Sequence, residues 1–454
     1  MAPSRPDPDI VTNASGVVDS KADVLAVDAI EAGVAAAHPE SVLRDSITLE
    51  GDGLRVADET YDLASYERVI VLGGGNAAGQ VASVLEALLN DRIDDGVVVT
   101  DDPAETSVVE IVEGSHPVPN EHASDGARSV LELASAADRE TLVLAAVTDG
   151  GSALLPAPAG DVTLSDLQLL TDDLLASGAS IDEINAVRKH VSALKGGRLA
   201  RAAAPATTVG LLFSDVAGDD PAVIASGPIS PDPTTYEDAI AVVEAHDLDV
   251  PASVVDHLDA GVTGGVVESP TAENPLFEHV DVHVLANGLT ALAAAADVCD
   301  SADFDPLILS TSVRGEAREA AKTHAAVAEE IRATGNPVEP PAAVLSGGEA
   351  TVTIRGEGTG GPNQEFALSA ALDLPDGVVL ASVDTDGIDG PTAFAGALVD
   401  GETAMPADEA SNALATNDVI PFLEQRDALL ETGPTGTNVN DLRVLLVPSD
   451  ILDD

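Results

Sequence analysis

Residues 68–89 decide the fold, and they read RVIVLGGGNAAGQVASVLEALL. A short β-branched strand runs into a glycine turn, and an Ala/Leu-rich helix follows. The same order returns with GVVVT at 96–100, TLVLAAVTDGGSALL at 141–155 and TTVGLLFSDVAGDD at 207–220. These strands are apolar throughout, and each is followed by a turn and a helix. The pattern predicts a parallel sheet covered on both faces, and hence the α/β class.

A second α/β run occupies the C-terminal part of the chain. Its expected strands are VDVHVLANG (280–288), PLILSTS (306–312), AAVLSGGEATVTI (342–354), GVVLASVDTDG (377–387) and LRVLLVP (442–448). ATVTI at 350–354 alternates apolar residues with Thr, which is typical of an antiparallel or edge strand. A polar stretch rich in Gly and Pro at 261–276 predicts a domain boundary. We therefore expect a flexible N-terminus at 1–20, an N-terminal domain at 21–265 and a smaller C-terminal domain at 275–454.

The composition excludes several classes of partner. Twenty Lys and Arg residues face 79 Asp and Glu residues, which gives a formal net charge of −59. Such a field repels nucleic acid and anionic lipid. Cys299 is the only cysteine, so no disulfide can form within the chain. No apolar run reaches the about 18 residues of a membrane span, and MAPSRPDPDI shows no signal peptide. We expect a cytoplasmic protein, and a homodimer is compatible with the sequence.

Lysine is scarce, and the acidic residues are spread along the whole chain. Only Lys21, Lys189, Lys195 and Lys322 occur, while 45% of the residues are apolar and can build cores. Carboxylates on every surface are tolerable in molar salt, where the Debye length is about 3 Å. We infer a halophilic protein; an acidic protein adapted to ordinary ionic strength is the alternative.

Five of the twenty basic residues fall within 185–201, NAVRKHVSALKGGRLAR. They are Arg188, Lys189, Lys195, Arg198 and Arg201, with His190 and Ser192 between them. On one continuous helix, Arg188, Lys195 and Arg198 would share a face. A cationic helix in so acidic a chain predicts an anion site for carboxylate or phosphate. An internal network of ion pairs is the alternative.

Two glycine turns stand where a strand meets a helix, at 73–80 (GGGNAAGQ) and 148–155 (TDGGSALL). Backbone N–H groups in such turns can bind an anion at the positive end of the helix dipole. The residues concerned are Gly74, Gly75, Asn76, Gly150, Gly151 and Ser152. A tight turn without a ligand is the alternative. The first turn fits only the tolerant G-x-G-x-x-A pattern, with Gly73, Gly75 and Ala78, and it is no Walker A loop.

Acidic residues follow several strands. Asp215, Asp219 and Asp220 come after the strand at 207–213 and suit Mg²⁺ binding or base catalysis, although acidic residues are common in this chain. The second half adds SGGE (346–349), GEGTGGPNQEFAL (356–368), DTDGIDGPTAFAG (384–396) and GPTGTNVNDL (433–442). Together the two halves predict a phosphate-handling cleft between two α/β domains.

Longer strings from these regions resemble one family. GGSALLPAP (150–158), INAVRKHVSALKGGRLA (184–200) and SDVAGDDPAVIASGPISPDPTT (214–235) look like the N-terminal domain of class II glycerate 2-kinases. SGGEATVTIRGEGTGGPNQEFAL (346–368), DTDGIDGPTAFAGA (384–397) and TGPTGTNVNDL (432–442) are similar to its C-terminal MOFRL domain. The resemblance implies a Rossmann-like N-terminal domain and a smaller α/β C-terminal domain. It also implies ATP- and Mg²⁺-dependent phosphorylation of D-glycerate at the 2-hydroxyl, giving 2-phosphoglycerate.

On this resemblance we assign the site residues. Asp386 is the expected base, and Lys195, Arg188 and Asp215 complete the catalytic set. Asp215 and Asp219 are the expected metal ligands. The expected substrate and nucleotide contacts are Gly74, Gly75, Asn76, Gly150, Gly151, Ser152, His190, Arg198, Asn363, Glu365, Asp389 and Asn438.

The sequence departs from the family pattern at two positions. The family usually has lysine where Asn76 stands and arginine where Pro362 stands. Because phosphoryl transfer needs cations on the migrating group, the alternative is a diverged paralogue. It would bind a small hydroxy acid or nucleotide with weak or no kinase activity. A reductase, a label some members carry, would need an NAD(P)H site.

The charge distribution gives a direct prediction. If the chain is halophilic, its melting temperature should rise steeply between low salt and molar KCl, because screening relieves the repulsion among its carboxylates. Thermal melts followed by circular dichroism over a KCl series measure this. Full stability in low salt would contradict the halophilic interpretation.

Overall fold

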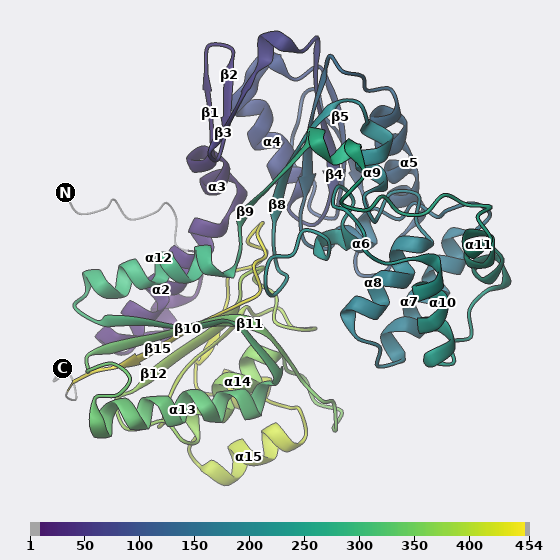
Figure 1. Ribbon diagram of the computed structural model, residues 1–454. Helices are drawn as coiled ribbons and strands as arrows, with labels where there is room; N and C mark the ends of the chain where they lie inside the picture. The colour runs from purple at the N-terminus through teal and green to yellow at the C-terminus, as the bar shows by residue number, and fades with distance from the viewer. Residues whose placement is uncertain (1–9, 450–454) are drawn as a thin grey trace. The chain divides into compact units, whose positions relative to one another are not determined.

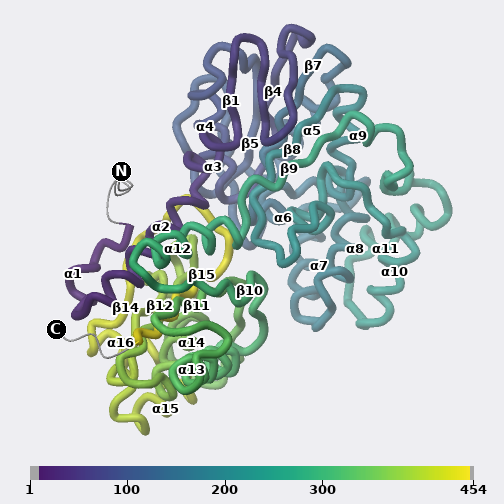
Figure 2. Tube along the Cα trace, turned by 60° about the vertical axis from the view of Figure 1, so that its left-hand side comes forward, coloured from purple at the N-terminus to yellow at the C-terminus, as the bar shows by residue number. Residues whose placement is uncertain are grey.

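The computed structural model describes residues 10–449 and divides them into two compact units. One unit is residues 39–285, here called the Rossmann-like unit; the other combines residues 10–38 with 286–449 and is called the mixed-sheet unit. The path of the chain through both can be followed by colour in Figure 2. No helix within the described residues has the length and apolarity needed to cross a bilayer.

The Rossmann-like unit is built on a six-stranded sheet with the order β6-β5-β4-β7-β8-β9. Its strands are β4 (Arg68–Gly74), β5 (Asp95–Thr100), β6 (Glu110–Glu113), β7 (Thr141–Val147), β8 (Thr207–Phe213) and β9 (Val280–Ala286). The pairs β4·β5, β5·β6, β4·β7 and β7·β8 are parallel, which confirms the prediction from the apolar strands. This order is that of a dinucleotide-binding sheet, with the first strand beside the fourth.

Helices cover both faces of this sheet, because its strands carry apolar side chains on both sides. α4 (Ala78–Leu89) lies against one face, and α5 (Glu121–Ser135) and α9 (Arg198–Ala203) lie against the other (Figure 1). A helical lobe of α7 (Leu164–Ala176), α8 (Ile181–His190), α10 (Tyr236–Ala245) and α11 (Ala252–Val262) has its own apolar core. The remaining elements are α3 (Pro39–Ser46), a small antiparallel sheet of β1 (Ile47–Glu50), β2 (Gly53–Val56) and β3 (Glu59–Asp62), α6 (Gly151–Leu154) and the 3-10 turns η1 (Leu63–Ser65), η2 (Asn90–Arg92), η3 (Ile224–Ser226) and η4 (Pro275–His279).

The mixed-sheet unit has the strand order β10-β11-β15-β12-β13-β14. The strands are β10 (Asp305–Glu316), β11 (Ala342–Thr351), β12 (Val379–Asp384), β13 (Gly396–Asp400), β14 (Leu429–Leu430) and β15 (Asp441–Val447). Only β10·β11 is parallel. α2 (Lys21–Ala37) and α12 (Gly288–Ser301) cover one face, and α13 (Ala317–Thr334) and α14 (Pro362–Ala371) the other (Figure 1). Short helices α1 (Ala14–Val17), α15 (Ala407–Ala415) and α16 (Ile420–Glu424) complete the unit.

Three details differ from the sequence-based expectations. Helix α2 belongs to the mixed-sheet unit, since its Gly33 packs against Leu442 and Ala291. Strand β9 extends the first sheet beside β8, so the compact unit continues beyond the expected boundary at 265. Of the alternating stretch 350–354, only Ala350 and Thr351 belong to a strand: they end β11 and pair parallel with β10, whereas the antiparallel pairing of β11 with β15 covers 342–348.

The N-terminal segment is also more ordered than expected where it is described. Asn13 Nδ2 donates to the carbonyl of Leu429 at 2.8 Å, and Thr12 N donates to the carbonyl of Glu431 at 2.7 Å. These hydrogen bonds hold residues 10–17 against the end of β14. The part of the predicted flexible N-terminus at 1–9 lies outside the described residues.

Candidate active site

The site of the Rossmann-like unit begins where β4 and β7 end. The chain proceeds from β4 toward one edge of the sheet and from β7 toward the other. In open α/β sheets this switch point, at the carboxyl ends of the strands, is where ligands bind. The turns that follow the two strands are 75–77 and 148–152.

The glycine turn after β4 serves close packing of the two strands. A Cβ on Gly73 would collide with the carbonyl of Ala146, and one on Gly75 would collide with Thr148. Gly74, still within β4, has the carbonyl of Val99 and the Leu155 side chain against it. The tight-turn interpretation therefore describes these glycines better than the ligand-binding one.

Most amides of the predicted backbone cradle already have protein acceptors. Gly75 N and Asn76 N donate to the carbonyls of Val99 and Asp149 at 3.0 and 2.7 Å. Gly150 N donates to the Asp149 side chain, and Gly151 N to the Thr148 carbonyl at 3.2 Å. An anion must therefore be held by side chains.

The basic segment 185–201 is not one helix. α8 ends at His190 and α9 starts at Arg198, because Gly196 and Gly197 take positive φ angles of 58° and 73° between them. Left-handed backbone of this kind favours glycine and turns the chain sharply. The predicted common helical face of Arg188, Lys195 and Arg198 does not exist.

Most of the basic residues in the segment are held by internal partners. Lys189 Nζ lies 3.3 Å from Asp232 Oδ1. Arg198 donates to the Lys189 carbonyl at 2.9 Å and to Ser269 Oγ at 2.8 Å, and Arg201 donates to the Glu268 carbonyl. For these residues the internal-network alternative describes the structure. Arg198 therefore does not offer its guanidinium to an anion as predicted.

His190 belongs to the same internal network. Its Nδ1 lies 2.7 Å from the Ala186 carbonyl and its Nε2 lies 2.8 Å from Glu268 Oε1. The ring is fully buried against Tyr236. The predicted ligand contact of His190 is thus replaced by packing and hydrogen bonds within the helical lobe.

Neither Arg188 nor Lys195 has an acidic partner among residues 10–449. Lys195 is only 4% exposed, and its Nζ donates to the carbonyl of Leu155 at 2.7 Å. Arg188, half-buried at the end of α8, makes no hydrogen bond or ion pair with another described residue. Burial, together with the positive charge of Arg188, lowers the pKa of Lys195 from its ordinary 10.5 to about 7. Two neighbouring cations without a carboxylate favour an anion from solution.

Uncharged polar groups lie on the segments that hold the two cations. Ser152 Oγ is 2.8 Å from Ser226 Oγ, and Ser226 donates to Asn185 Oδ1 at 2.9 Å. Asn185 is on α8, one turn before Arg188. Ser152 is in α6, and Leu155, the carbonyl partner of Lys195, directly follows that helix. Cations and hydroxyl groups close together suit a hydroxy acid or a phosphate ester.

Asp215 and Asp219 lie in the turn after β8, at the same edge of the parallel sheet. Within the described residues, no group of three or more His, Cys, Asp or Glu side chains is arranged to hold a metal ion. Mg²⁺ commonly keeps several waters and takes one or two carboxylates together with the phosphates of a substrate. Two half-buried carboxylates fit such a shared ion.

In the mixed-sheet unit, Asn363 and Asp389 are occupied internally rather than directed at a ligand. The Asp389 carboxylate accepts from the backbone of Asn363 and of Gln364 at 2.9 Å each, which caps α14. Burial raises the pKa of Asp389 to about 7. Asn363 Nδ2 donates to Asp441 Oδ1 at 2.6 Å, and Asn363 Oδ1 accepts from Ser382 at 2.6 Å.

Glu365 is also internal. It accepts from Asn417 Nδ2 at 2.7 Å and lies 3.2 Å from Arg318 Nη2. Next to this pair, Arg443 contacts Asp441 and lies over the Phe366 ring at 4.3 Å. The predicted ligand contacts of Asn363, Glu365 and Asp389 are thus replaced by a buried network under α14.

Asp386 and Asn438 remain as candidates in that unit. Both are half-buried; Asp386 Oδ1 accepts from Ile388 N at 2.7 Å, and Asn438 Oδ1 accepts from Asn440 N at 2.8 Å. Neighbouring Asp384 has a pKa raised well above its ordinary value by burial, with Asp386 adding to the shift. The base role of Asp386 and the contact of Asn438 stay predictions.

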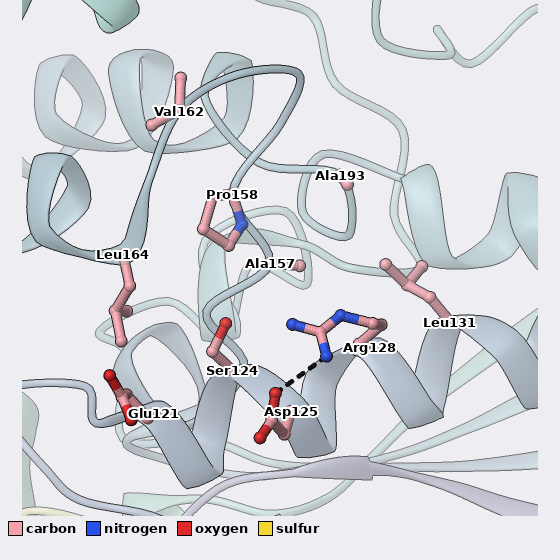
Figure 3. A pocket seen from close by; sticks show the side chains of 10 residues that line it. All are labelled: Glu121, Ser124, Asp125, Arg128, Leu131, Ala157, Pro158, Val162, Leu164 and Ala193. Atoms are coloured by element: carbon pink, nitrogen blue, oxygen red, sulfur yellow. Dashed lines mark hydrogen bonds and ion pairs between the residues drawn. The ribbon is translucent and has the colours of Figure 1, made fainter.

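A groove of about 460 Å³ elsewhere in the Rossmann-like unit carries none of these residues (Figure 3). Helix α5 supplies its polar wall, and residues 157–164 supply much of its apolar wall. Its one cation, Arg128, is paired with Asp125 at 2.8 Å. The groove therefore offers no unpaired positive charge to an anion.

Comparison with known proteins places the chain in one family. Residues 25–259 match a domain of unknown function (DUF4147), and residues 342–441 match the MOFRL family. The D-glycerate 2-kinase of Thermotoga maritima is 40% identical over 402 residues, which cover 87% of this chain and 94% of that protein. The chain belongs to the glycerate 2-kinase family.

Two further members show the breadth of the likeness. A putative hydroxypyruvate reductase of Agrobacterium vitis is 41% identical, covering 84% of this chain and 87% of that protein. The crystal structure of glycerate kinase from Thermotoga maritima matches with a TM-score of 0.82 and 38% identity, covering 93% of this chain and 99% of that one. The family resemblance read from the sequence is thereby confirmed.

Sequence reasoning missed Asn185 and Ser226 as part of the site. Both stand inside strings quoted for the family resemblance, but neither is charged. The signal that could have found Ser226 is conformational: it has a φ of 61°, which only the fold reveals.

The cation pair predicts pH-dependent anion binding. Lys195 is protonated below about pH 7 and neutral above it, so sulfate affinity should fall about tenfold or more from pH 6 to pH 9 as a charge-assisted contact is lost. In the same range stability should rise with pH, because the unfolded chain then binds one proton more than the folded one. Isothermal calorimetry with sulfate at fixed KCl, together with melts, measures both.

Matched variants assign the effect. Lys195→Met should bind sulfate weakly at both pH values. Lys189→Met removes a buried lysine that already has Asp232 as partner, and should keep the pH dependence. Unchanged sulfate binding in Lys195→Met would show that the pair is no anion site.

Proposed function

We propose that this protein phosphorylates D-glycerate at its 2-hydroxyl with ATP and releases 2-phosphoglycerate. The observation that carries the proposal is the pair Arg188 and Lys195, two cations without an acidic partner beside the switch point of a Rossmann-like sheet. Membership of the glycerate 2-kinase family supports the same reaction, since the Thermotoga relative is a D-glycerate 2-kinase.

The cation pair has two chemical tasks in this proposal. It binds the carboxylate of glycerate or a phosphate of the nucleotide, and it stabilises negative charge that develops during transfer. The effect of such charges is large in a site shielded from water, because screening there is weak. Lys195 is well placed for this, since its buried ammonium has a single carbonyl acceptor.

Magnesium would be held by Asp215 and Asp219 together with the nucleotide phosphates. When bound, it would neutralise charge on the transferred phosphoryl group. Asp386 is the proposed base, which would take the proton of the 2-hydroxyl. The Ser152 hydroxyl would contact a substrate oxygen.

The two departures from the family pattern have local structural explanations but leave fewer cations. Asn76 has its side-chain oxygen against Gly150, where it is buried without a hydrogen-bond partner among the described residues. Pro362 starts α14, a position that proline favours. With no lysine or arginine at these positions, we propose that Arg188 and Lys195 supply the positive charge. The diverged-paralogue alternative is not favoured, because the likeness to kinases extends over most of the chain.

We also propose a cytoplasmic location in a cell with a high salt concentration. The acidic composition supports the proposal of a high salt concentration in the cell. The single cysteine, Cys299, is free and buried, and burial raises the pKa of its thiol to about 12. Such a thiol is poorly reactive and gives no sign of an oxidising compartment.

A direct assay tests the function. Purified full-length protein in molar KCl, given ATP, Mg²⁺ and D-glycerate, should form 2-phosphoglycerate, which ³¹P NMR distinguishes from the 3-phosphate. Asp386→Asn should lower kcat by about 10²-fold or more without changing the KM for ATP, since a missing base acts only in the transition state.

The variant also shows that turnover belongs to this chain and not to a contaminating kinase. Folded wild-type protein without turnover would refute the proposed function. Turnover that Asp386→Asn leaves intact would remove Asp386 from the mechanism.

A further inference from the structure

A chain of three hydrogen-bonding side chains runs through the Rossmann-like unit beside the cation pair. Ser152 Oγ lies 2.8 Å from Ser226 Oγ, and Ser226 Oγ donates to Asn185 Oδ1 at 2.9 Å. Asn185 and Ser226 are buried, whereas Ser152 is half-buried. The chain therefore links a buried amide to a hydroxyl that solvent and small molecules can reach.

Counting protons fixes the direction of these hydrogen bonds. A serine hydroxyl has one proton, and that of Ser226 goes to Asn185 Oδ1. Either serine could donate in this pair; with the Asn185 oxygen facing Ser226, as the structure places it, Ser152 is the donor. Its only proton is then used, and Ser152 Oγ can only accept a hydrogen bond from a ligand.

The backbone holds this arrangement at a conformational cost. Ala225, Ser226 and Gly227 have φ angles of 50°, 61° and 63°, so two residues with a Cβ lie in the left-handed region in succession. Left-handed backbone is unfavourable for residues with a Cβ, because the Cβ comes too close to a carbonyl oxygen. Gly196 N donates to the Ser226 carbonyl at 3.1 Å and helps to keep the turn in place. Strain that a fold maintains in this way often marks a functional constraint.

Asn185, at the buried end of this series of hydrogen bonds, has an unsatisfied donor. Asn185 Nδ2 is buried and has no hydrogen-bond partner among the described residues. Asn185 and Arg188 are three residues apart on α8 and so lie on one side of the helix. Arg188 thus lies on the same side of α8 as a buried amide donor that the described residues leave unsatisfied.

We propose that Asn185 and Ser226 are positioning residues that make Ser152 an obligate acceptor for the non-reacting 3-hydroxyl of D-glycerate. The 2-hydroxyl has to give up its proton during phosphoryl transfer, so the 3-hydroxyl is the donor left for Ser152. The substrate class is then a carboxylic acid with two neighbouring hydroxyl groups. This inference rests on the proposed function, since it assigns the specificity of the same site.

Two analogues of D-glycerate probe the acceptor role. D-Lactate lacks the 3-hydroxyl, and tartronate carries a carboxylate there, which can only accept. The wild-type protein should bind both about three- to tenfold more weakly than D-glycerate, the effect of one hydrogen bond. Isothermal calorimetry in molar KCl gives the three dissociation constants.

Ser226→Gly tests this series of hydrogen bonds without destabilising the fold. Glycine relieves the left-handed strain, so the melting temperature should stay or rise. Ser152 then has a free proton and can donate or accept. D-glycerate should bind about three- to tenfold more weakly, and tartronate should bind more tightly than it does to the wild type. Opposite changes for two similar acids are not expected from a loosened turn.

Ser230→Ala is the matched control. Ser230 is a buried serine four residues further along the same loop, and its Oγ has no hydrogen-bond partner among residues 10–449. Its removal should leave all three dissociation constants unchanged. If Ser226→Gly bound all three acids more weakly by the same factor, or if none of the dissociation constants changed, the positioning role would be overturned.

The outcomes also separate this inference from the function itself. Wild-type protein that binds the acids with the expected selectivity but forms no 2-phosphoglycerate would overturn the proposed function alone. Wild-type turnover with unaltered selectivity in Ser226→Gly would overturn the inference alone. Failure of the wild-type protein to bind D-glycerate would overturn both.

Discussion

The central constraint on this protein is that buried Lys195 lies within electrostatic reach of half-buried Arg188, and neither has a carboxylate partner among residues 10–449. Burying an unpaired charge is expensive, and the lowered pKa of Lys195 is the visible consequence. Acidic residues outnumber basic ones about fourfold, so a structural cation could easily find a partner. Lys189, only six residues from Lys195, has Asp232. We propose that a ligand anion supplies the counter-charge that the pair lacks.

The surrounding structure keeps this pair in place. α8 must end at His190 and the chain must turn at Gly196 and Gly197 for Lys195 to reach the carbonyl of Leu155. The other basic side chains of the segment tie α8 and α9 to their neighbours through Asp232, Ser269 and Glu268. The segment that suggested one cationic surface thus consists mostly of structural contacts, and Arg188 and Lys195 are its two proposed functional residues.

The parallel sheet could be predicted from the sequence because its strands are apolar throughout and each runs into a glycine turn. The site could be predicted only in part, since residue type does not reveal whether a polar group already has a partner. Asn363, Glu365 and Asp389 look like ligand contacts in the sequence, yet Asp441, Arg318 and the start of α14 satisfy them. Ser226 and Asn185 could not be found in the sequence for the converse reason: the role proposed for them depends on the direction of a hydrogen bond.

A crystal structure of the full-length protein with D-glycerate tests the central claim most directly. The account predicts density for the acid or its phosphate with an anionic group between Arg188 and Lys195, and with a hydroxyl beside Ser152. Density for the acid at another place, with Arg188 and Lys195 still without a counter-charge, would contradict it.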